Sequence, residues 1–229
     1  MPGTDVIAEG LSVRGGRGPV FENVSTAVEA GGALLVRGPA GSGRTSLLLA
    51  LSGRMRFVSG AVRVGQHYLP REAAAVRETV ALARAGPACQ LEERLRVDDL
   101  IAERCWIDRV DRPAVSAAFD LVGIDVPGRV RVEDLDSVAN VLLAVALAVA
   151  RGPGAVVVDE PDDGCAREGR ARVWSGLARV RESGITLLLS GTDPTPNLPD
   201  AVPVVLPQRS GERLAGAERA ERNGGRGAT

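Results

Sequence analysis

The spacing of hydrophobic and polar positions changes along the chain and predicts stretches of different secondary structure. Residues 6–36 alternate apolar and polar side chains between glycine-rich turns, which predicts short strands of an antiparallel edge sheet. Residues 60–69 show the pattern of a further short hairpin strand. From about residue 71 to residue 131 the chain is rich in charged residues and alanine and is punctuated by prolines, which predicts a helical lobe.

Continuous apolar runs indicate strands that are buried on both faces. Ala33–Arg37, Ala155–Val158 and Ile185–Leu189 have this pattern, and Arg167–Glu182 between the last two is helical by its period. The order strand, helix, strand favours a parallel sheet covered by helices. We therefore expect an α/β fold with a parallel core sheet, an N-terminal antiparallel β subdomain and an inserted α-helical subdomain at about residues 83–131.

The length and charge of the chain narrow the classes of protein that it can belong to. The 229 residues suit one large α/β domain, for which we predict residues 1–208. Residues 209–229 have almost no large apolar side chains and end in glycines, which predicts a flexible tail. A net charge of −1 shows no basic excess, so we expect no nucleic acid partner.

Cysteines and apolar runs predict the compartment. The three cysteines are far apart and form neither a disulfide framework nor a zinc-binding pattern, so a reducing cytosol is expected. The N-terminal residues lack the pattern of a secretory signal. The longest apolar run, residues 138–150, is shorter than the roughly 20 helical residues that cross a bilayer. Membrane association would therefore need another chain.

The stretch GPAGSGRTS follows a predicted buried strand and has the spacing of a phosphate-binding loop. Gly38, Gly41 and Gly43 stand where a side chain would obstruct backbone N–H groups that turn toward an anion. Thr45 has the position of the hydroxyl that binds Mg²⁺. A glycine-rich turn without a ligand is the alternative, because Arg44 stands where such loops carry lysine. The predicted nucleotide-binding residues are Gly38, Pro39, Ala40, Gly41, Ser42, Gly43, Arg44, Thr45 and Ser46.

A second candidate cluster ends the strand of the stretch AVVVDEP. Asp159 and Glu160 lie at its carboxyl end, where ligands bind in open α/β sheets. Asp159 could hold a hydrated Mg²⁺, and Glu160 could act as the general base toward water. Taken alone, the pair is better explained as acidic residues that end a strand before a proline turn. Its place between a phosphate loop and another core strand favours the site.

These segments together resemble the ATP-binding cassette, the nucleotide-binding subunit of ABC transporters, over residues 5 to about 208. GPAGSGRTS matches the Walker A loop of that family and VVVDEP its Walker B strand. The resemblance implies a P-loop NTPase (RecA-like) core, ATP and Mg²⁺ as ligands, Thr45 and Asp159 at the metal, and Glu160 as the catalytic residue. It also implies a second cassette, homo- or heterodimeric, and a membrane-spanning permease, which places the chain in the cytoplasm on the inner face of the membrane.

Several positions depart from the pattern of the family. The signature LSGGQ aligns with residues 135–139, LDSVA, in which both glycines are replaced and Asp136 would repel a phosphate. The switch histidine aligns with Thr192, and no glutamine stands at residues 83–85. The helix that follows the signature is apolar on every side, so either a partner covers it or this chain packs differently.

The arginine at position 44 can reflect drift in the composition of the chain, because all 28 basic residues are arginine and none is lysine. Arginine keeps the positive charge of lysine, but its planar guanidinium is bulkier and cannot act as a point charge inside the loop. We therefore expect weakened ATP binding and impaired positioning of the γ-phosphate.

Two functions remain open at this point. The first is an ATP-binding subunit of an ABC transporter that binds Mg-ATP, has weak or no hydrolysis of its own, and energises or regulates a separate permease. The alternative is a catalytically inactive cassette that serves as a regulatory or structural subunit beside an active partner cassette. A soluble cassette acting on DNA or ribosomes is disfavoured, since the charge is balanced.

Overall fold

The computed structural model describes residues 3–16, 18–191, 198 and 200–207. Thr192 and the predicted tail at 209–229 lie outside these residues. Among the described residues, no helix has both the length and the hydrophobicity that crossing a membrane requires.

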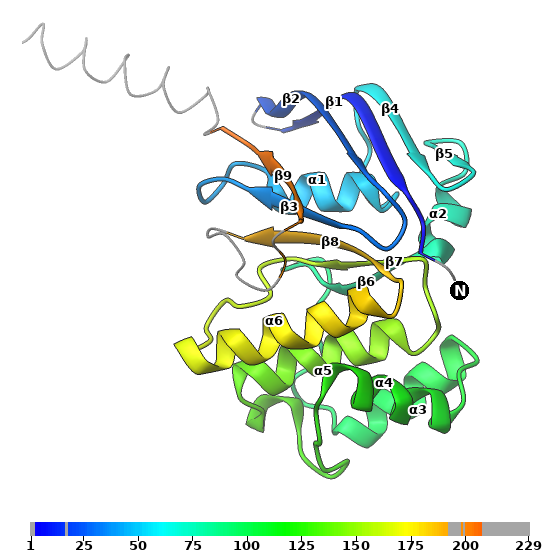
Figure 1. Cartoon of the computed structure of the whole chain (residues 1–229), viewed down its shortest axis with the longest axis vertical. Helices are drawn as coiled ribbons and strands as arrows, with labels where there is room; N and C mark the ends of the chain where they lie inside the picture. Colours follow the sequence, from blue (N-terminus) through cyan, green and yellow to red (C-terminus); the bar gives the residue numbers. More distant parts are fainter. Residues whose placement is uncertain (1–2, 17, 192–197, 199, 208–229) are drawn as a thin grey trace, which may run out of the picture.

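Two sheets form the framework of the fold (Figure 1). An antiparallel sheet has the strand order β2-β1-β4-β5, and a sheet with parallel pairings has the order β6-β7-β8-β3-β9. The strands are β1 (Val6–Gly15), β2 (Gly18–Val28), β3 (Ala33–Arg37), β4 (Ser59–Val64), β5 (His67–Leu69), β6 (Val80–Arg84), β7 (Ala155–Val158), β8 (Thr186–Gly191) and β9 (Val202–Val205).

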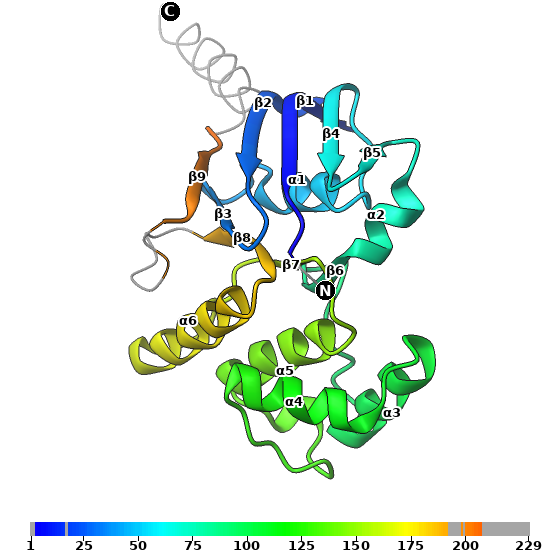
Figure 2. The same ribbon diagram turned by 45° about the vertical axis from the view of Figure 1, so that its right-hand side comes forward.

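Helices cover the parallel sheet on both faces. Figure 1 shows α1 between the two sheets, while α5 and α6 lie on the other face of the parallel sheet and α4 packs against these two helices. In Figure 2, α3 and α4 lie farthest from the antiparallel sheet and α2 lies at the edge of the molecule. The helices are α1 (Arg44–Leu51), α2 (Ala73–Thr79), α3 (Val97–Ile107), α4 (Arg112–Val122), the 3₁₀ turn η1 (Val132–Asp134), α5 (Ser137–Val149) and α6 (Arg167–Glu182).

The apolar side chains form two hydrophobic clusters, one on each face of the parallel sheet. Leu34 and Val157 point to the face that packs on α1 and the antiparallel sheet. Leu35 and Val156 point to the face covered by α4, α5 and α6. Because both faces are covered, the strands consist of continuous apolar runs rather than alternating ones.

The predicted fold class is confirmed, including the antiparallel β subdomain, the parallel sheet and the strand Ala33–Arg37. One assignment was wrong, because Val80–Arg84 form β6 at the edge of the parallel sheet where the pattern predicted helix. The prediction failed there because VALAR is short and directly follows the helix α2, so the pattern shows no separate strand. Helices α3 and α4 do occupy the predicted helical range, and the division into domains stays a prediction.

The apolar helix after the signature position is α5, and it is covered by its own chain. Ten of its side chains are buried. Nine of them, all but Ala144, belong to the hydrophobic cluster that α4, α6 and the parallel sheet share. Of the two alternatives that the sequence left open, the described residues support packing within the chain.

Candidate nucleotide-binding site

The glycine-rich loop connects β3 to α1 and has the backbone that its glycines allow. Gly43 precedes α1 with a φ of 99°, and a Cβ on it would lie 2.7 Å from Val20 Cγ1. A Cβ on Gly38 would lie 2.5 Å from the carbonyl oxygen of Leu206. Since no side chain in the described part of the protein caps the first turn of α1, its backbone N–H groups remain available to an anion.

The other predicted loop residues form its tip and its base. Pro39, Ala40 and Gly41 are exposed at the tip, and Ser46 is half-buried in α1. The N–H of Ser42 donates to the carbonyl oxygen of Pro39 at 3.1 Å. The Ser42 hydroxyl is buried and has no hydrogen-bond partner among the described residues. This loop therefore presents a free polar atom as well as free N–H groups.

Asp159 directly follows β7 and is bound on several sides. Its N–H donates to the carbonyl oxygen of Arg84 at 2.9 Å, which ties it to β6. Thr45 Oγ1 donates to Asp159 Oδ2 at 2.6 Å, and only 5% of Asp159 is exposed. The loop and the acidic strand end, 114 residues apart in the chain between these two side chains, therefore meet in the structure.

The contact between Thr45 and Asp159 also fits a magnesium ion. A hydroxyl and a carboxylate are hard oxygen donors of the kind that Mg²⁺ accepts together with phosphate oxygens and water. Both side chains stand beside the open N-terminus of α1, where a phosphate group would bind. These residues would hold the ion, which would neutralise phosphate charge when bound.

Arg44 is folded back over the loop. Its Nη1 donates to the carbonyl oxygen of Gly38, and its Nη2 donates to Glu160 Oε1. The Arg44 side chain is 9% exposed, whereas that of Glu160 is 43% exposed. The charge that the sequence assigned to the phosphates is therefore paired with the predicted general base in this structure.

Ser190 belongs to the site and was missed by the sequence analysis. It lies in β8, next to β7 in the sheet, and is fully buried. Its hydroxyl donates to Asp159 Oδ1 and accepts the N–H of Glu160 at 2.9 Å. A serine near the end of a buried strand carries no motif, so the available signal was its place at the same carboxyl edge as Asp159.

The segment aligned with the signature begins α5. Asp136 caps this helix, and its Oδ1 accepts the N–H of Ala139 at 2.7 Å. Val138 is 7% exposed and packs in the hydrophobic cluster with α6. The feature that sets this helix end apart is therefore not Val138, whose side chain is buried. The distinguishing feature is the carboxylate of Asp136.

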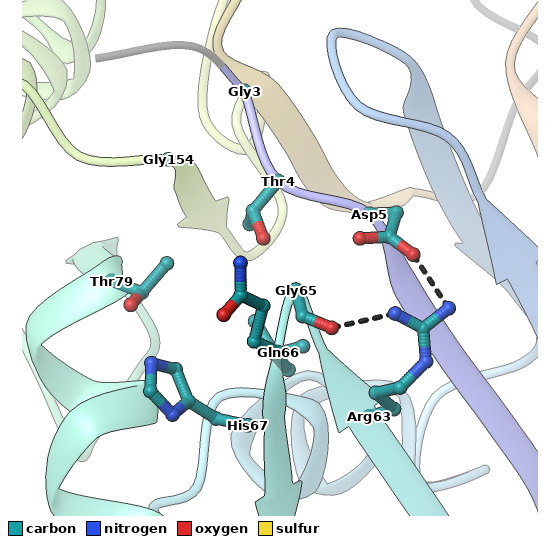
Figure 3. Close-up of a pocket in the computed structure, with 10 residues that line it drawn as sticks. Gly3, Thr4, Asp5, Arg63, Gly65, Gln66, His67, Thr79 and Gly154 are labelled. Atoms are coloured by element: carbon teal, nitrogen blue, oxygen red, sulfur yellow. Dashed lines mark hydrogen bonds and ion pairs between the residues drawn. The ribbon is translucent and has the colours of Figure 1, made fainter.

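A cavity of about 580 Å³ lies elsewhere, at the amino ends of β6 and β7 (Figure 3). Thr79 and Gly154, which line it, directly precede these two strands, whereas Asp159 follows β7 at the opposite end. Arg63 in its wall pairs with Asp5 at 2.8 Å. This cavity is therefore separate from the phosphate loop.

The geometry defines a class of protein first. A glycine loop between a parallel strand and a helix, facing an aspartate that ends a neighbouring strand, is the P-loop nucleotide-binding fold. Two solved structures share the fold. An ATP-bound bacterial Atm1-family ABC exporter matches with a TM-score of 0.73 at 17% identity, over 100% of this chain and 43% of that chain. A putative ABC transporter ATP-binding protein of Pyrococcus furiosus matches with a TM-score of 0.72 at 18% identity, over 88% and 97% of the chains.

Sequence comparison identifies the family. The ABC transporter family model matches residues 21–163. The cytochrome c biogenesis ATP-binding export protein CcmA of Sphingopyxis alaskensis is 34% identical over 78% of this chain and 84% of its own length. The daunorubicin resistance ATP-binding protein DrrA3 of Streptomyces coeruleorubidus is 29% identical over 83% of this chain and 61% of its own. The chain belongs to the ABC transporter family.

Proposed function

We propose that the chain is the ATP-binding subunit of an ABC transporter, that it binds Mg-ATP between the glycine loop and Asp159, and that it acts on a separate membrane permease. The contact of Thr45 with Asp159 at 2.6 Å carries the proposal, because it joins the two halves of one phosphate and metal site. The open N-terminus of α1 beside this contact supports it further. The similar proteins CcmA and DrrA3 are named as ATP-binding proteins, which agrees with this proposal.

In this proposal each site residue has a defined task. The loop from Gly38 to Ser46 binds the phosphates through its backbone, and Thr45 and Asp159 hold Mg²⁺. Glu160 is the residue that would orient a water for hydrolysis. Arg44 must leave Glu160 before its charge can reach a phosphate, so the first function predicts slow hydrolysis.

A second candidate function rests on the start of α5. In the family resemblance this segment binds the γ-phosphate of the nucleotide on a partner cassette, yet here it is capped by the Asp136 carboxylate. A carboxylate at that place repels phosphate. The chain would then be a regulatory subunit whose own loop is completed by the signature of a different, active cassette. Both functions place the chain on the cytoplasmic face of the membrane through a permease.

Calorimetric titration of the purified chain with Mg-ATP, followed by a phosphate-release assay, tests the proposal. We expect saturable binding, and the Arg44→Ala variant measures whether its charge contributes to affinity. Phosphate release that Glu160→Gln abolishes selects the first function. Binding without release selects the regulatory subunit. Absence of heat at every Mg-ATP concentration contradicts both.

A further inference from the structure

We propose that Ser190 is a positioning residue, whose single hydroxyl orients the Asp159 carboxylate for the metal and directs Glu160 toward the site. This inference rests on the proposed function, because it assigns a task toward the Mg-ATP of that site. It adds to the site a residue that lies outside both the phosphate loop and the strand that ends in Asp159.

The first argument is the sharing of the Asp159 carboxylate between two hydroxyls. Ser190 donates to Oδ1, whereas Thr45 donates to Oδ2 at 2.6 Å. Holding both oxygens from different elements, β8 and α1, fixes the plane of the carboxylate. Ser190 occupies Oδ1, and Oδ2 is thereby left facing Thr45.

The second argument concerns what happens to this carboxylate when a metal binds. Asp159 is 5% exposed, and a buried carboxylate is costly unless donors satisfy it. If the Thr45 hydroxyl turns away from Asp159 to bind a metal, Asp159 loses the hydrogen bond that Thr45 donates. In the described part of the chain, Ser190 is then the side chain that still donates to this carboxylate. Partners of this kind, which hold a metal ligand without touching the metal, set ligand orientation and affinity.

The third argument is the backbone of Glu160. This residue has a φ of 47°, in the left-handed region that non-glycine residues rarely adopt. Its N–H donates to Ser190 Oγ at 2.9 Å, so the hydroxyl that holds Asp159 also holds the strained turn that follows. A hydroxyl that accepts one bond while it donates another is polarised toward the acceptor. The buried hydroxyl of Ser190 thus couples the metal ligand, Asp159, to the candidate base, Glu160.

The test compares two substitutions of nearly equal shape. Ser190→Val and Ser190→Thr add similar volume at a site that is 0% exposed, but only threonine keeps the hydroxyl. For each variant the dissociation constant of ATP is measured by calorimetry with Mg²⁺ and again with EDTA. We expect Ser190→Val to lose about 10-fold or more of the gain in affinity that Mg²⁺ provides, with little change in EDTA, and Ser190→Thr to retain it.

Two further variants separate the loss of the Ser190 hydroxyl from a general disturbance of packing. Ser190→Ala removes the hydroxyl without crowding the core, so it reports on the same loss if the larger side chains disturb folding. Ser52→Ala is the matched control, because Ser52 is equally buried and donates to the carbonyl oxygen of Leu49 at 3.1 Å, in α1. We expect this control to keep the full Mg²⁺ gain.

The possible outcomes separate this inference from the proposed function. Equal Mg²⁺ gain in wild type, Ser190→Ala and Ser190→Val would overturn the positioning role while leaving ATP binding intact. Equal losses with Mg²⁺ and with EDTA would also overturn it, since they mark a general structural defect. A wild-type chain that binds ATP without any Mg²⁺ gain overturns the metal role of Asp159 together with that of Ser190. A wild-type chain that binds no ATP at all contradicts the proposed function itself.

Discussion

The N-termini of α1 and α5 differ in whether they can bind an external anion. α1 begins after Gly43, and none of the side chains that the structure describes caps its first turn. α5 begins after Asp136, whose carboxylate already accepts the N–H of Ala139 at 2.7 Å. Both helix ends carry the positive end of a dipole, so the difference lies in the residue before each helix. The comparison teaches that one end can receive a phosphate, whereas the other holds an anion of its own.

The comparison also bears on how such a chain would pair with another cassette. In the proposed function its loop and Asp159 would supply metal and phosphate ligands from one chain, because Thr45 and Asp159 are in contact. Where the family pattern has a serine followed by two glycines, the start of α5 has Asp136, Ser137 and Val138, and the Asp136 carboxylate caps the helix. We therefore expect the two surfaces to contribute unequally in a dimer, which favours an asymmetric pair.

The largest effect is expected from a substitution that obstructs the N-terminus of α1. Gly43→Ala should weaken Mg-ATP binding by about 100-fold, since an alanine in the left-handed backbone conformation costs roughly 1–3 kcal/mol before any crowding. The added Cβ would also lie 2.7 Å from Val20 Cγ1. Calorimetry with Mg-ATP measures the affinity. Gly41→Ala is the matched control, with a φ of 76° and no atom within 4 Å of its Cβ, and should cost less. Equal losses in the two variants would contradict the role of crowding at Gly43.

The next effect concerns the hydroxyl that joins the α1 end to Asp159. Thr45→Val should lower the affinity for Mg-ATP by about 10-fold or more, because the variant removes an oxygen that would bind Mg²⁺. Thr45→Ser keeps the hydroxyl and should stay close to wild type. Parallel titrations of the two variants in Mg²⁺ and in EDTA check this. A valine variant with wild-type affinity in Mg²⁺ would remove Thr45 from the metal site.

A smaller effect, of the opposite sign, is expected at Glu160. Glu160→Gln releases the Arg44 guanidinium from its carboxylate and should tighten ATP binding by up to about 5-fold, since a half-exposed pair contributes at most about 1 kcal/mol. The double variant with Arg44→Ala isolates the pair, because the gain should vanish when the arginine is absent. A gain that persists in the Arg44→Ala background would show that the ion pair does not restrain the loop.

The smallest effect is expected at the α5 end. Asp136→Ala removes the cap and should destabilise the chain by about 1 kcal/mol, which lowers the melting temperature by about 2–4 °C for a chain of this size. Asp136→Ser keeps a good cap and should leave stability within about 0.5 kcal/mol of wild type. Thermal unfolding followed by circular dichroism measures both. Equal melting temperatures for Asp136→Ala and wild type would show that the cap contributes nothing.

Much of the architecture could be predicted because the local hydrophobic patterns match the burial of each element in the tertiary structure. Ala33–Arg37 and Ala155–Val158 are apolar at almost every position, which matches strands that are covered on both faces. The strand β6 escaped prediction because a short alanine-containing segment lies between helices and carries no distinct period. The burial of α5 was visible as an all-apolar helix, but which elements cover it was not.

The candidate site was predicted in part. The loop and Asp159 were identified from their spacing and their place at strand ends, and the structure brings Thr45 and Asp159 together. The partner of Arg44 could not be predicted, because a long side chain has many rotamers and its choice depends on which charges lie nearby. Ser190 had no motif to mark it.

The sequence by itself determined the two kinds of sheet, the glycine loop and the carboxyl edge at which Asp159 and Glu160 lie, since these depend on local period, glycine spacing and strand direction. Only the tertiary structure decided that Arg44 pairs with Glu160, that Ser190 holds Asp159 and Glu160 together, and that Val138 turns inward while Asp136 caps its helix. The physical reason is the range of the contacts. The first pair is separated by 116 residues and the contacts of Ser190 by 30 and 31, so they exist only once β7, β8 and α1 are packed side by side. For Val138 and Asp136, the packing of α5 against α6 decides which face of the helix is buried.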